Sequence, residues 1–323
     1  MRIVITGATG FIGSNLAEVF LKQGAEVFAL VRPESHHISV LPSHENLHVV
    51  SCSLDCVMDC VDKIGQADGF FHFAWGGVNR EEIDSPQVQA ENVAGSLECV
   101  RAAAALGCRI FMDAGSRVEY GRAEGMMQED IACCPVNQYG KAKLEFYEKA
   151  RPLCESLGMT YYHLRFFSVY GAGDHPWSII STLVRELRQD KTVSLSACQH
   201  QWNFMYIEDA VNAVYALYQS AWEKERPQLS GSAVNIASTD TRKLRSFVEE
   251  IHELAGGRGR LEYGTFIQAK EGPVSICPDT ERLRQLTGGW QEKFTFRQGI
   301  LATMEQEDRR AEASASMEGV KKW

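Results

Sequence analysis

A glycine-rich turn close to the N-terminus constrains the fold of this chain more than any other feature. The β-branched run Arg2–Thr6 predicts a buried strand, and apolar residues at helical intervals over Phe11–Lys22 predict a helix. Gly7, Gly10 and Gly13 follow a Gly-x-x-Gly-x-x-Gly spacing. Glycines let the backbone approach a phosphate closely, and a helix N-terminus supplies free N–H donors and a partial positive charge. The sequence therefore predicts a pyrophosphate-binding turn between a strand and a helix.

Composition limits the partners that we expect. The chain has 323 residues and a formal net charge of −9, so we expect about two domains with a sizeable core and no electrostatic footprint for nucleic acid. No apolar run reaches the roughly 18 residues of a membrane span, and the N-terminus leads straight into a strand. Ten cysteines without a Cys-x-x-Cys pair favour free thiols in a reducing compartment. We therefore predict a cytoplasmic protein without a membrane segment.

Arg32 follows the predicted second strand, residues 25–31. In dinucleotide-binding folds an acidic residue at this place binds the ribose 2′-hydroxyl of NAD, whereas an arginine suits the 2′-phosphate of NADP. A guanidinium can bind phosphate through two hydrogen bonds, and Ser35 can assist. The sequence therefore favours NADP(H) and leaves NAD(H) open, because an acidic residue could lie off this register.

Three cysteines lie four residues apart, at Cys52, Cys56 and Cys60, with several histidines upstream. These spacings match none of the usual zinc patterns. We expect the cysteines to be small apolar fillers of one helix face. The sequence therefore predicts no metal site.

The first half of the chain alternates predicted strands and helices. Strands are expected over Leu47–Ser51, 69–75 and 109–114, and long helices over 87–106 and 135–153. The strand at 69–75 is almost wholly apolar, as expected for a parallel sheet that is covered on both faces. The alternation predicts an α/β fold with a doubly wound parallel sheet.

Several motifs are spread over nearly the whole chain. They are the segment 6–13, Ser116 four residues before Tyr120-Gly121, Tyr139-x-x-x-Lys143, and the segments 164–171, 204–210, 234–237 and 289–290. Together they resemble the extended short-chain dehydrogenase/reductases, and most closely their nucleotide-sugar epimerases, dehydratases and ketoreductases. The resemblance implies a Rossmann fold, a smaller C-terminal α/β substrate-binding domain, and a nucleotide-diphosphate sugar as substrate.

The two predicted domains interleave. The dinucleotide-binding Rossmann domain is expected to comprise residues 1–170 and about 204–240, because strands such as 204–207 return to the parallel sheet. Residues 171–203 and 241–323 contain more irregular structure. They are expected to form the substrate-binding domain.

Tyr139 and Lys143 are the candidate proton-transfer pair. They lie one helical turn apart, so both side chains project from the same helix face. A nearby ammonium group lowers the pKa of a phenol from about 10 toward the working pH. Tyr139 can then exchange a proton with a sugar hydroxyl or carbonyl while hydride moves to or from the cofactor. Ser116, at the C-terminal end of a strand, can donate a hydrogen bond to the same substrate oxygen.

The resemblance also implies contacts to the cofactor and to the substrate. Cofactor contacts beyond Gly7, Gly10, Gly13 and Arg32 are expected from Thr9, Phe11, Ile12, Leu54, Asp55, Ala74, Asn92, Ala114, Tyr139, Lys143 and Phe166. Substrate contacts are expected from Trp75, Ser116, Arg117, Ser168, Trp202 and Lys270. Ser168 stands where relatives commonly have asparagine, and Trp202 stands where epimerases often have a diphosphate-binding arginine. Lys270-Glu271-Gly272 resembles an Arg-x-Gly element that grips the diphosphate, so Lys270 is the better candidate for that contact.

The reaction is narrowed by the residues after Ser116. Related dehydratases carry an Asp-Glu pair there, whereas this chain has Arg117 and Val118, and Glu119 lies one place too late. A one-residue shift points a side chain elsewhere, so dehydration is disfavoured. A 4-ketoreductase using NADPH and a 4-epimerase that recycles its own hydride both remain, and Arg32 favours reduction.

Two further expectations come from the family. The helices near 87–106 and 136–157 often pair with their copies across a two-fold axis, which implies a homodimer. A relative that binds a dinucleotide without chemistry, as a sensor or scaffold, is the second alternative function. The intact set of Ser116, Tyr139 and Lys143 favours an active enzyme over that alternative.

Overall fold

The computed structural model describes residues 1–323 apart from 36, 80, 124, 225–228, 267–274 and 321–323, and apart from the side chains of 313–320. The chain divides into two compact units. The first unit comprises Met1–Phe167, Ala210–Ile236 and Asp279–Gln291, and the second comprises Ser168–Asp209, Ala237–Pro278 and Glu292–Trp323.

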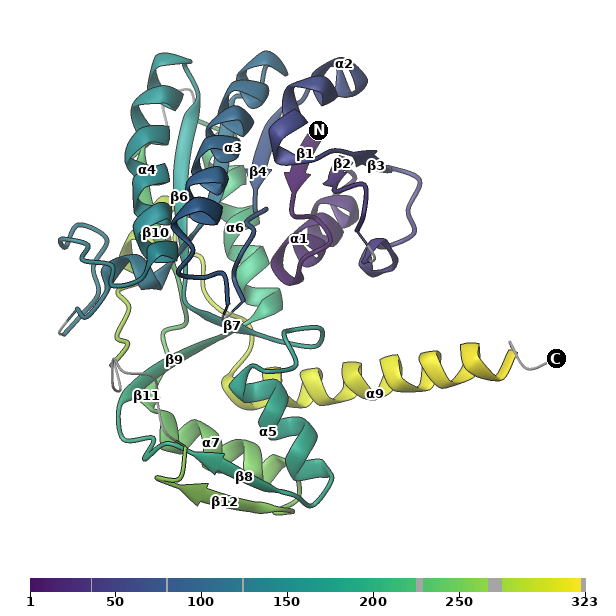
Figure 1. Ribbon diagram of the computed structural model, residues 1–323, viewed down its shortest axis with the longest axis vertical. Coiled ribbons are helices and arrows are strands. Elements are labelled where there is room, and N and C mark those ends of the chain that lie inside the picture. The colour runs from purple at the N-terminus through teal and green to yellow at the C-terminus, as the bar shows by residue number, and fades with distance from the viewer. Residues whose placement is uncertain (36, 80, 124, 225–228, 267–274, 321–323) are drawn as a thin grey trace. The chain divides into compact units, whose positions relative to one another are not determined.

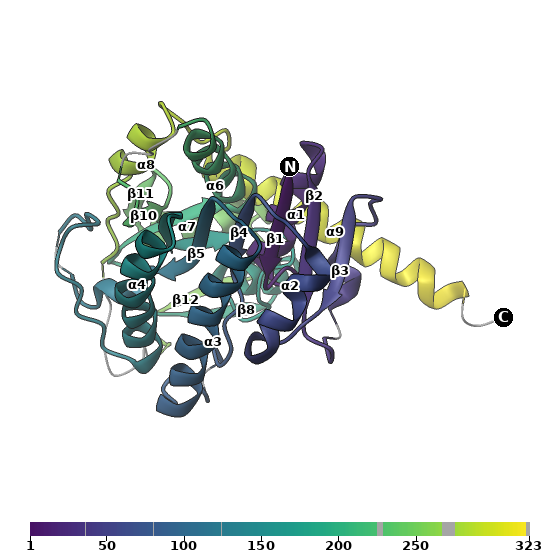
Figure 2. The same cartoon turned by 90° about the horizontal axis from the view of Figure 1, so that it is seen from above.

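The first unit is built on a seven-stranded sheet in the order β10-β6-β5-β4-β1-β2-β3 (Figure 1 and Figure 2). Its strands are β1 (Arg2–Thr6), β2 (Glu26–Val31), β3 (Leu47–Ser51), β4 (Gly69–His72), β5 (Ile110–Ser116), β6 (Thr160–Phe166) and β10 (Ser232–Ile236). Every neighbouring pair is parallel, so each connection must cross over the sheet, and helices make these crossovers. The predicted doubly wound α/β fold is confirmed.

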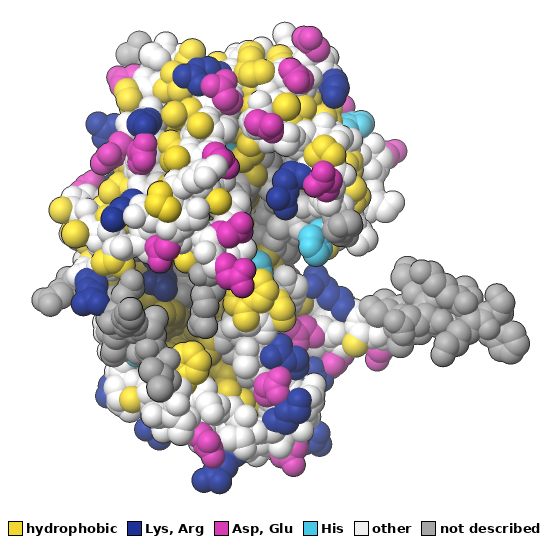
Figure 3. All heavy atoms as spheres, viewed as in Figure 1, with side chains coloured by type: hydrophobic (Ala, Val, Ile, Leu, Met, Phe, Trp, Pro, Cys, Tyr) yellow, Lys and Arg dark blue, Asp and Glu magenta, His cyan; other side chains and the backbone are white. Residues whose placement is uncertain are grey.

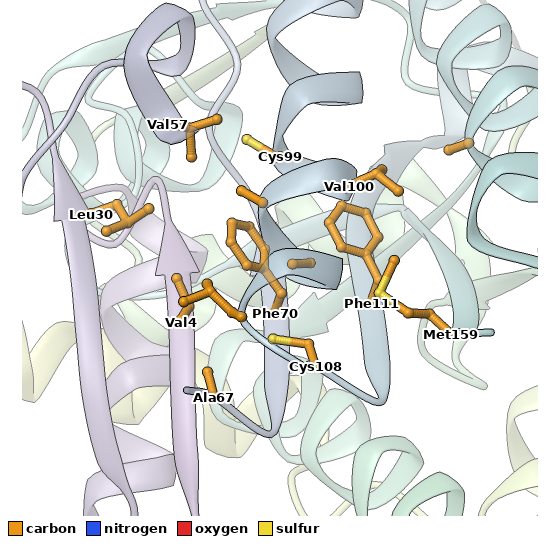
Figure 4. Close-up of a cluster of buried hydrophobic side chains, with 14 of the residues drawn as sticks. Val4, Leu30, Val57, Ala67, Phe70, Cys99, Val100, Cys108, Phe111 and Met159 are labelled. Carbon is orange, nitrogen blue, oxygen red and sulfur yellow. The ribbon is translucent and has the colours of Figure 1, made fainter. Parts of the chain in front are cut away.

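Helices cover both faces of this sheet (Figure 2). They are α1 (Phe11–Lys22), α2 (Val61–Ile64), α3 (Pro86–Ala105), α4 (Gln138–Ser156), α6 (Ile207–Trp222) and α8 (Glu281–Leu286), with the 3-10 helices η1 (Ile38–Val40), η2 (Leu54–Cys60) and η3 (Arg117–Tyr120). Successive residues of a strand point to opposite faces. Phe70 therefore stacks on Phe111 in the core cluster beside α3 and α4 (Figure 4), while Phe71 packs on Phe20 of α1 and Tyr218 of α6.

β4 ends at His72 and is therefore shorter than the strand predicted over 69–75. The N–H groups of Phe73 and Ala74 both lie 3.2 Å from the hydroxyl oxygen of Thr6, which accepts them. These bonds turn the chain out of the sheet directly after β4. The apolar pattern continues past the strand and could not show this ending.

α4 begins three residues later than the helix predicted over 135–153. Asn137 is extended and caps the helix, and its side-chain oxygen accepts the N–H of Gly140 at 2.8 Å. Asparagine is a favoured cap because it satisfies an N–H group that has no partner within the helix. β5 in turn runs to residue 116, so Ser116 is the last residue of a strand.

The three evenly spaced cysteines do not fill one helix face as predicted. Cys52 and Cys60 are buried, whereas Cys56 is exposed. The segment forms the irregular 3-10 helix η2, whose backbone at Cys56 is not helical (φ −119°). A four-residue spacing therefore does not bring the three thiols to the same side.

The described residues of the second unit form two small sheets and three helices. One sheet has the order β11-β9-β7, from β7 (Ser168–Tyr170), β9 (Gln201–Tyr206) and β11 (Thr241–Lys243), and the other pairs β8 (Thr192–Leu195) with β12 (Arg260–Tyr263). The helices are α5 (Ile179–Arg188), α7 (Leu244–Leu254) and α9 (Phe296–Val320). Its core is aromatic, with Phe204 against Tyr170, Phe247 and Phe296.

The strand that contains Phe204 does not return to the parallel sheet, contrary to the sequence prediction. It is β9, which pairs in parallel with β7 and antiparallel with β11. Residues 204–209 therefore belong to the second unit, although they were assigned to the dinucleotide-binding domain. Residues 279–291 belong to the first unit, although they were assigned to the substrate-binding domain. Burial of Phe204 among the aromatic rings of the second unit accounts for the placement of β9.

Two further features concern the surface and the helices. Basic and acidic side chains are interspersed among the coloured residues of the face shown in Figure 3. Among the described residues, no helix is both long enough and apolar enough to cross a membrane.

Candidate functional site

The turn between β1 and α1 is shaped by close backbone contacts at its glycines. Gly7 has a φ of +67°, and a Cβ there would lie 2.6 Å from the backbone N of Ala74. A Cβ at Gly13 would lie 2.3 Å from the carbonyl oxygen of Gly7. Gly10 is the N-cap of α1 and brings no side chain to the first N–H groups of the helix. The turn therefore fits a pyrophosphate, which needs those N–H groups and a close approach to the backbone.

The strand register brings the predicted residues to one edge of the sheet. Thr6 pairs with Leu30 of β2 and with His72 of β4, and Asp113 of β5 pairs with His72 and with His163 of β6. β1, β2 and β4 therefore end within one residue of the same level, and β5 and β6 extend up to three residues further. The predicted residues at or just beyond this edge are Gly7, Arg32, Ala74, Ala114, Ser116 and Phe166.

A hydrogen-bonded chain that the sequence did not reveal supports the segment after β4. The Thr6 hydroxyl lies 2.8 Å from Nδ1 of His72, and Nε2 of His72 lies 2.7 Å from the hydroxyl of Ser96 on α3. Burial, together with the charge of Lys143, lowers the pKa of His72 to about 3. The ring is therefore neutral, with one nitrogen donating and the other accepting. The only sequence signal was a histidine in an otherwise apolar strand.

Asn92 and Trp75 are joined to the same segment. The amide of Asn92 donates to the carbonyl oxygen of Gly76 and accepts the N–H of Gly76, both at 2.9 Å. Nε1 of Trp75 donates to the side-chain oxygen of Gln89 at 2.9 Å. Asn92, a predicted cofactor contact, thus holds the backbone of the segment that includes Ala74.

Lys143 is buried at the centre of the site and is only 3% exposed. Its Nζ donates to the carbonyl oxygen of Ala114 at 2.7 Å and lies 3.6 Å from the ring centroid of Trp75. Burial lowers the pKa of Lys143 to about 8, although Asp113 and Glu119 oppose this. The structure thus brings together Ala114, Trp75 and Lys143, which were predicted from three separate parts of the sequence.

Tyr139 is half-buried beside Trp75, with ring centroids 6.2 Å apart. Burial raises the pKa of Tyr139 to about 12, and a hydrogen bond with the Ser116 side chain and the charge of Arg117 oppose the rise. The prediction that Lys143 lowers the pKa of Tyr139 is therefore wrong for the protein without a bound dinucleotide. The Lys143 ammonium is directed to Ala114 and Trp75, and it lies 5.8 Å from the Tyr139 ring centroid.

The residues after Ser116 form the short helix η3, and Ser116 is its cap. Oε1 of Glu119 accepts the backbone N–H of Ser116 at 2.6 Å, and the Glu119 side chain is fully buried. The prediction that the shifted Glu119 points elsewhere is confirmed. Arg117 is half-buried, and burial lowers its pKa to about 10, although Tyr139 opposes this.

Three further predicted cofactor residues, Arg32, Leu54 and Asp55, lie near the outer strands β2 and β3, whereas Thr9, Phe11 and Ile12 lie in the turn after β1 and the first turn of α1. Arg32 is exposed directly after β2, and its carbonyl oxygen accepts the N–H of Ser35 at 3.0 Å. Leu54 and Asp55 begin η2, where Leu54 packs against Gly95 of α3 and Asp55 is exposed. The described part of the chain has no cluster of His, Cys, Asp or Glu that could hold a metal ion.

Two predicted substrate residues lie outside the first unit. Ser168 and Trp202 belong to the second unit, in β7 and β9. Trp202 pairs with Arg242 of β11, and its ring centroid lies 5.4 Å from that of His200. Lys270 lies outside the described residues.

Comparison with known proteins identifies relatives along the whole chain. Residues 3–237 match the NAD dependent epimerase/dehydratase family. The chain is 26% identical over 311 residues to a Bacillus subtilis protein named uncharacterized UDP-glucose epimerase YtcB, and the match covers 88% of this chain and 92% of that protein.

Solved structures show the same fold. The epimerase Mth375 of Methanothermobacter thermautotrophicus is similar with a TM-score of 0.83 and 21% identity, over 97% of this chain and 93% of that one. The protein MoeE5, in complex with UDP-glucuronic acid and NAD, is similar with a TM-score of 0.78 and 25% identity, over 96% of this chain and 100% of that one.

Proposed function

We propose, since this chain belongs to the NAD dependent epimerase/dehydratase family, that it reduces the 4-keto group of a nucleotide-diphosphate sugar with hydride from NADPH. The observation that carries the proposal is the placement of Ser116, Tyr139 and Lys143 at the same sheet edge as the glycine turn. When bound there, NADPH supplies the hydride for the carbonyl carbon. The protein supplies binding, orientation and the proton.

Tyr139 is the proton donor in this proposal. A pKa raised to about 12 keeps the phenol protonated at neutral pH, which suits an acid that gives its proton to a carbonyl oxygen. Ser116 donates a hydrogen bond to the same oxygen and stabilises the negative charge that develops on it. Tyr139 then recovers a proton from solvent. Reduction thus forms one C–H bond and one O–H bond at the former carbonyl.

Binding of the dinucleotide is assigned to residues at the glycine turn and at the strand ends. Gly7, Gly10 and Gly13 hold the pyrophosphate at the start of α1. Lys143, already fixed by the carbonyl oxygen of Ala114, holds the nicotinamide ribose. Arg32 holds the 2′-phosphate of NADP(H), and its exposed position after β2 supports this.

The substrate class is supported by the relatives and by the residues around Ser116. MoeE5 has been observed with UDP-glucuronic acid, and YtcB carries the name of a UDP-glucose epimerase. Arg117 and Trp75 adjoin Ser116 and Lys143 and are the proposed sugar contacts. Ser168, Trp202 and Lys270 remain proposed contacts to the sugar and diphosphate.

A 4-epimerase is the second candidate. The names of YtcB and Mth375 favour it, and so does the NAD found with MoeE5. An epimerase uses the same Tyr139 first as a base and then as an acid, and it retains its cofactor between the two hydride transfers. Its substrate and product differ only in the configuration of one carbon.

An assay with both cofactors separates the two candidates. The protein is incubated with a nucleotide-diphospho-4-keto sugar and either NADPH or NADH, while cofactor oxidation and sugar products are followed. Stoichiometric oxidation of NADPH with formation of one alcohol supports reduction. Interconversion of two UDP-hexoses without added cofactor, together with NAD(H) or NADP(H) released on denaturation, supports epimerisation and overturns the reductase. Cofactor binding without either reaction supports a sensor or scaffold.

A further inference from the structure

Four charged side chains are buried together behind Ser116. Asp113 of β5, Glu119 of η3, and His163 and Arg165 of β6 are each at most 2% exposed. We call these four residues the buried ionic cluster. Two carboxylates face one guanidinium and one imidazole, so the formal charges cancel only when His163 is protonated. A buried charge without a partner is costly, so the charge state of His163 matters to the whole cluster.

The geometry of His163 requires a proton on each ring nitrogen. Nδ1 lies 2.9 Å from a carboxylate oxygen of Asp113, and Nε2 lies 3.0 Å from both carboxylate oxygens of Glu119. A neutral imidazole has only one N–H and could donate to only one of the two acids. Burial opposes the charge, but Asp113 and Glu119 outweigh it and raise the pKa of His163 to about 9.

Glu119 joins the cluster to Ser116. Its Oε2 accepts from Nε of Arg165 at 2.8 Å, while its Oε1 accepts the backbone N–H of Ser116 at 2.6 Å. Burial opposes ionisation, but His163 and Arg165 outweigh it and hold the pKa of Glu119 at about 2. The bond from Ser116 is therefore made to a full negative charge, which makes it short and strong.

The cluster also touches the elements that carry the candidate catalytic residues. A Cβ at Gly115, the residue before Ser116, would lie 2.3 Å from Nε2 of His163. Tyr147 of α4 stacks on the His163 ring at a centroid distance of 4.7 Å. Tyr147 follows Lys143 by one helical turn, so the cluster contacts α4 as well as the end of β5.

We propose that the buried ionic cluster positions Ser116, with Glu119 as the residue that holds its backbone and His163 and Arg165 as the residues that hold Glu119. The inference rests on the proposed function, in which the Ser116 hydroxyl meets the substrate oxygen. The four residues act through Ser116 rather than on the reacting atoms. They are positioning residues, and they fix the Ser116 backbone at the end of β5 before substrate binds.

Glu119→Gln tests the contact without substrate. Glutamine keeps the shape of glutamate and removes its charge. In ¹⁵N-labelled wild-type protein we expect the Ser116 amide proton far downfield with slow exchange, and N–H protons on both nitrogens of His163 near neutral pH. In Glu119→Gln the Ser116 amide should move upfield and exchange faster. A Ser116 amide that does not change, or a His163 ring with a single N–H in the wild type, would overturn the proposal.

Glu129→Gln is the matched control. Glu129 is also buried, and its Oε1 accepts the backbone N–H of Asn235 at 3.0 Å instead of that of Ser116. The same chemical change there should leave the Ser116 amide and the turnover at wild-type values. An equal shift in both variants would show a general structural effect and contradict the specific role of Glu119.

Kinetics then measure the consequence for catalysis. We expect Glu119→Gln to lower kcat about 10- to 100-fold while KM changes by less than about threefold, because the hydrogen bond from Ser116 stabilises negative charge that develops mainly in the transition state. An unchanged kcat would overturn the positioning role. If the wild-type protein turns over no nucleotide sugar, the proposed function fails, and the NMR comparison alone decides the inference.

A double variant that keeps the charges of the cluster balanced tests the proposal if Glu119→Gln does not fold. Glu119→Gln leaves the cluster with an extra positive charge, whereas Glu119→Gln/His163→Gln removes one charge of each sign. The double variant should show the same upfield shift of the Ser116 amide. Retention of the wild-type shift in the folded double variant would contradict the proposal.

Discussion

A substitution of Tyr139 tests its proposed role as the proton donor. Tyr139→Phe removes the phenol oxygen and keeps the ring beside Trp75. We expect kcat to fall about 10²- to 10⁴-fold, the contribution usual for a positioned acid, with cofactor affinity nearly unchanged. Steady-state kinetics and calorimetric titration with NADPH measure the two effects. Tyr215→Phe is the control, because Tyr215 of α6 packs on Phe20 of α1 on the opposite face of the sheet. Equal turnover in both variants would remove Tyr139 from the mechanism.

The role of a single residue could be predicted from the sequence where one local pattern defines that role. It could not be predicted where the role depends on contacts with distant parts of the chain. The glycine turn was predictable because one strand and one helix define it. The site of Lys143 was predictable only in part: its helical spacing from Tyr139 was visible, whereas its bond to the carbonyl oxygen of Ala114 was not. The lowered pKa expected for Tyr139 was wrong because that bond and the Trp75 ring hold the ammonium elsewhere.

The residue that follows β2 should determine the preference for NADPH over NADH. Arg32 follows β2 directly and is exposed, so it can be exchanged without disturbing the core. We expect Arg32→Glu to weaken NADPH binding by about tenfold or more, because a carboxylate repels the 2′-phosphate and can accept from the 2′-hydroxyl of NADH. Titrations with both cofactors give the ratio of affinities. A ratio equal to that of the wild type would place the 2′-phosphate contact elsewhere.

α3 provides a test of the proposed homodimer. Ala90, Ala94 and Arg101 are exposed along one side of this helix, and Leu97 between them is half-buried. Small residues at helical spacing allow close approach of a second copy, so we expect Ala94→Glu to shift the protein toward monomer. Sedimentation equilibrium at micromolar concentration measures this. A monomeric wild type would refute the dimer.

Element boundaries show where the sequence was insufficient. Apolar periodicity predicted β1 and α1 because each is defined by its own residues. β4 ended early because the Thr6 hydroxyl captured the N–H groups that follow it, and α4 started late because Asn137 capped it. β9 was assigned to the wrong sheet because the side chain of Phe204 finds its partners in Phe247 and Phe296, far along the chain.

Between about pH 6.5 and 8 the folded protein should lose stability as the pH rises, because of His163. Its pKa in the folded protein, about 9, lies above the ordinary value of about 6.5. Protonation therefore stabilises the fold fully below about pH 6.5, and this contribution is lost as the pH rises through about 9. Urea unfolding at a series of pH values should show a slope on the order of 1 kcal/mol per pH unit from about pH 6.5 to 8, because above about pH 8 the lowered pKa of Lys143 adds a slope of opposite sign. From about pH 6.5 to 8 the slope should be absent in His163→Gln. It should be kept in His252→Gln, which changes a half-buried histidine of α7 in the second unit.

Long-range pairing limited what the sequence could reveal about the whole molecule. His163 meets Asp113 fifty positions earlier in the chain, and nothing in either local pattern joins them. A charged residue within an apolar strand was the available signal at both positions. The parallel register of β5 and β6 converts that signal into a buried ion pair.

The buried cysteine thiols of the core cluster can report transient opening of the hydrophobic core. Cys99 and Cys108 lie in that cluster (Figure 4), and burial raises the pKa of both thiols, that of Cys108 to about 12. Because the thiolate is the reacting form, a thiol reagent should modify exposed Cys56 and Cys134 at once and the core thiols only when the sheet and α3 separate. The rate at which the buried thiols are modified then measures how often the folded core opens transiently.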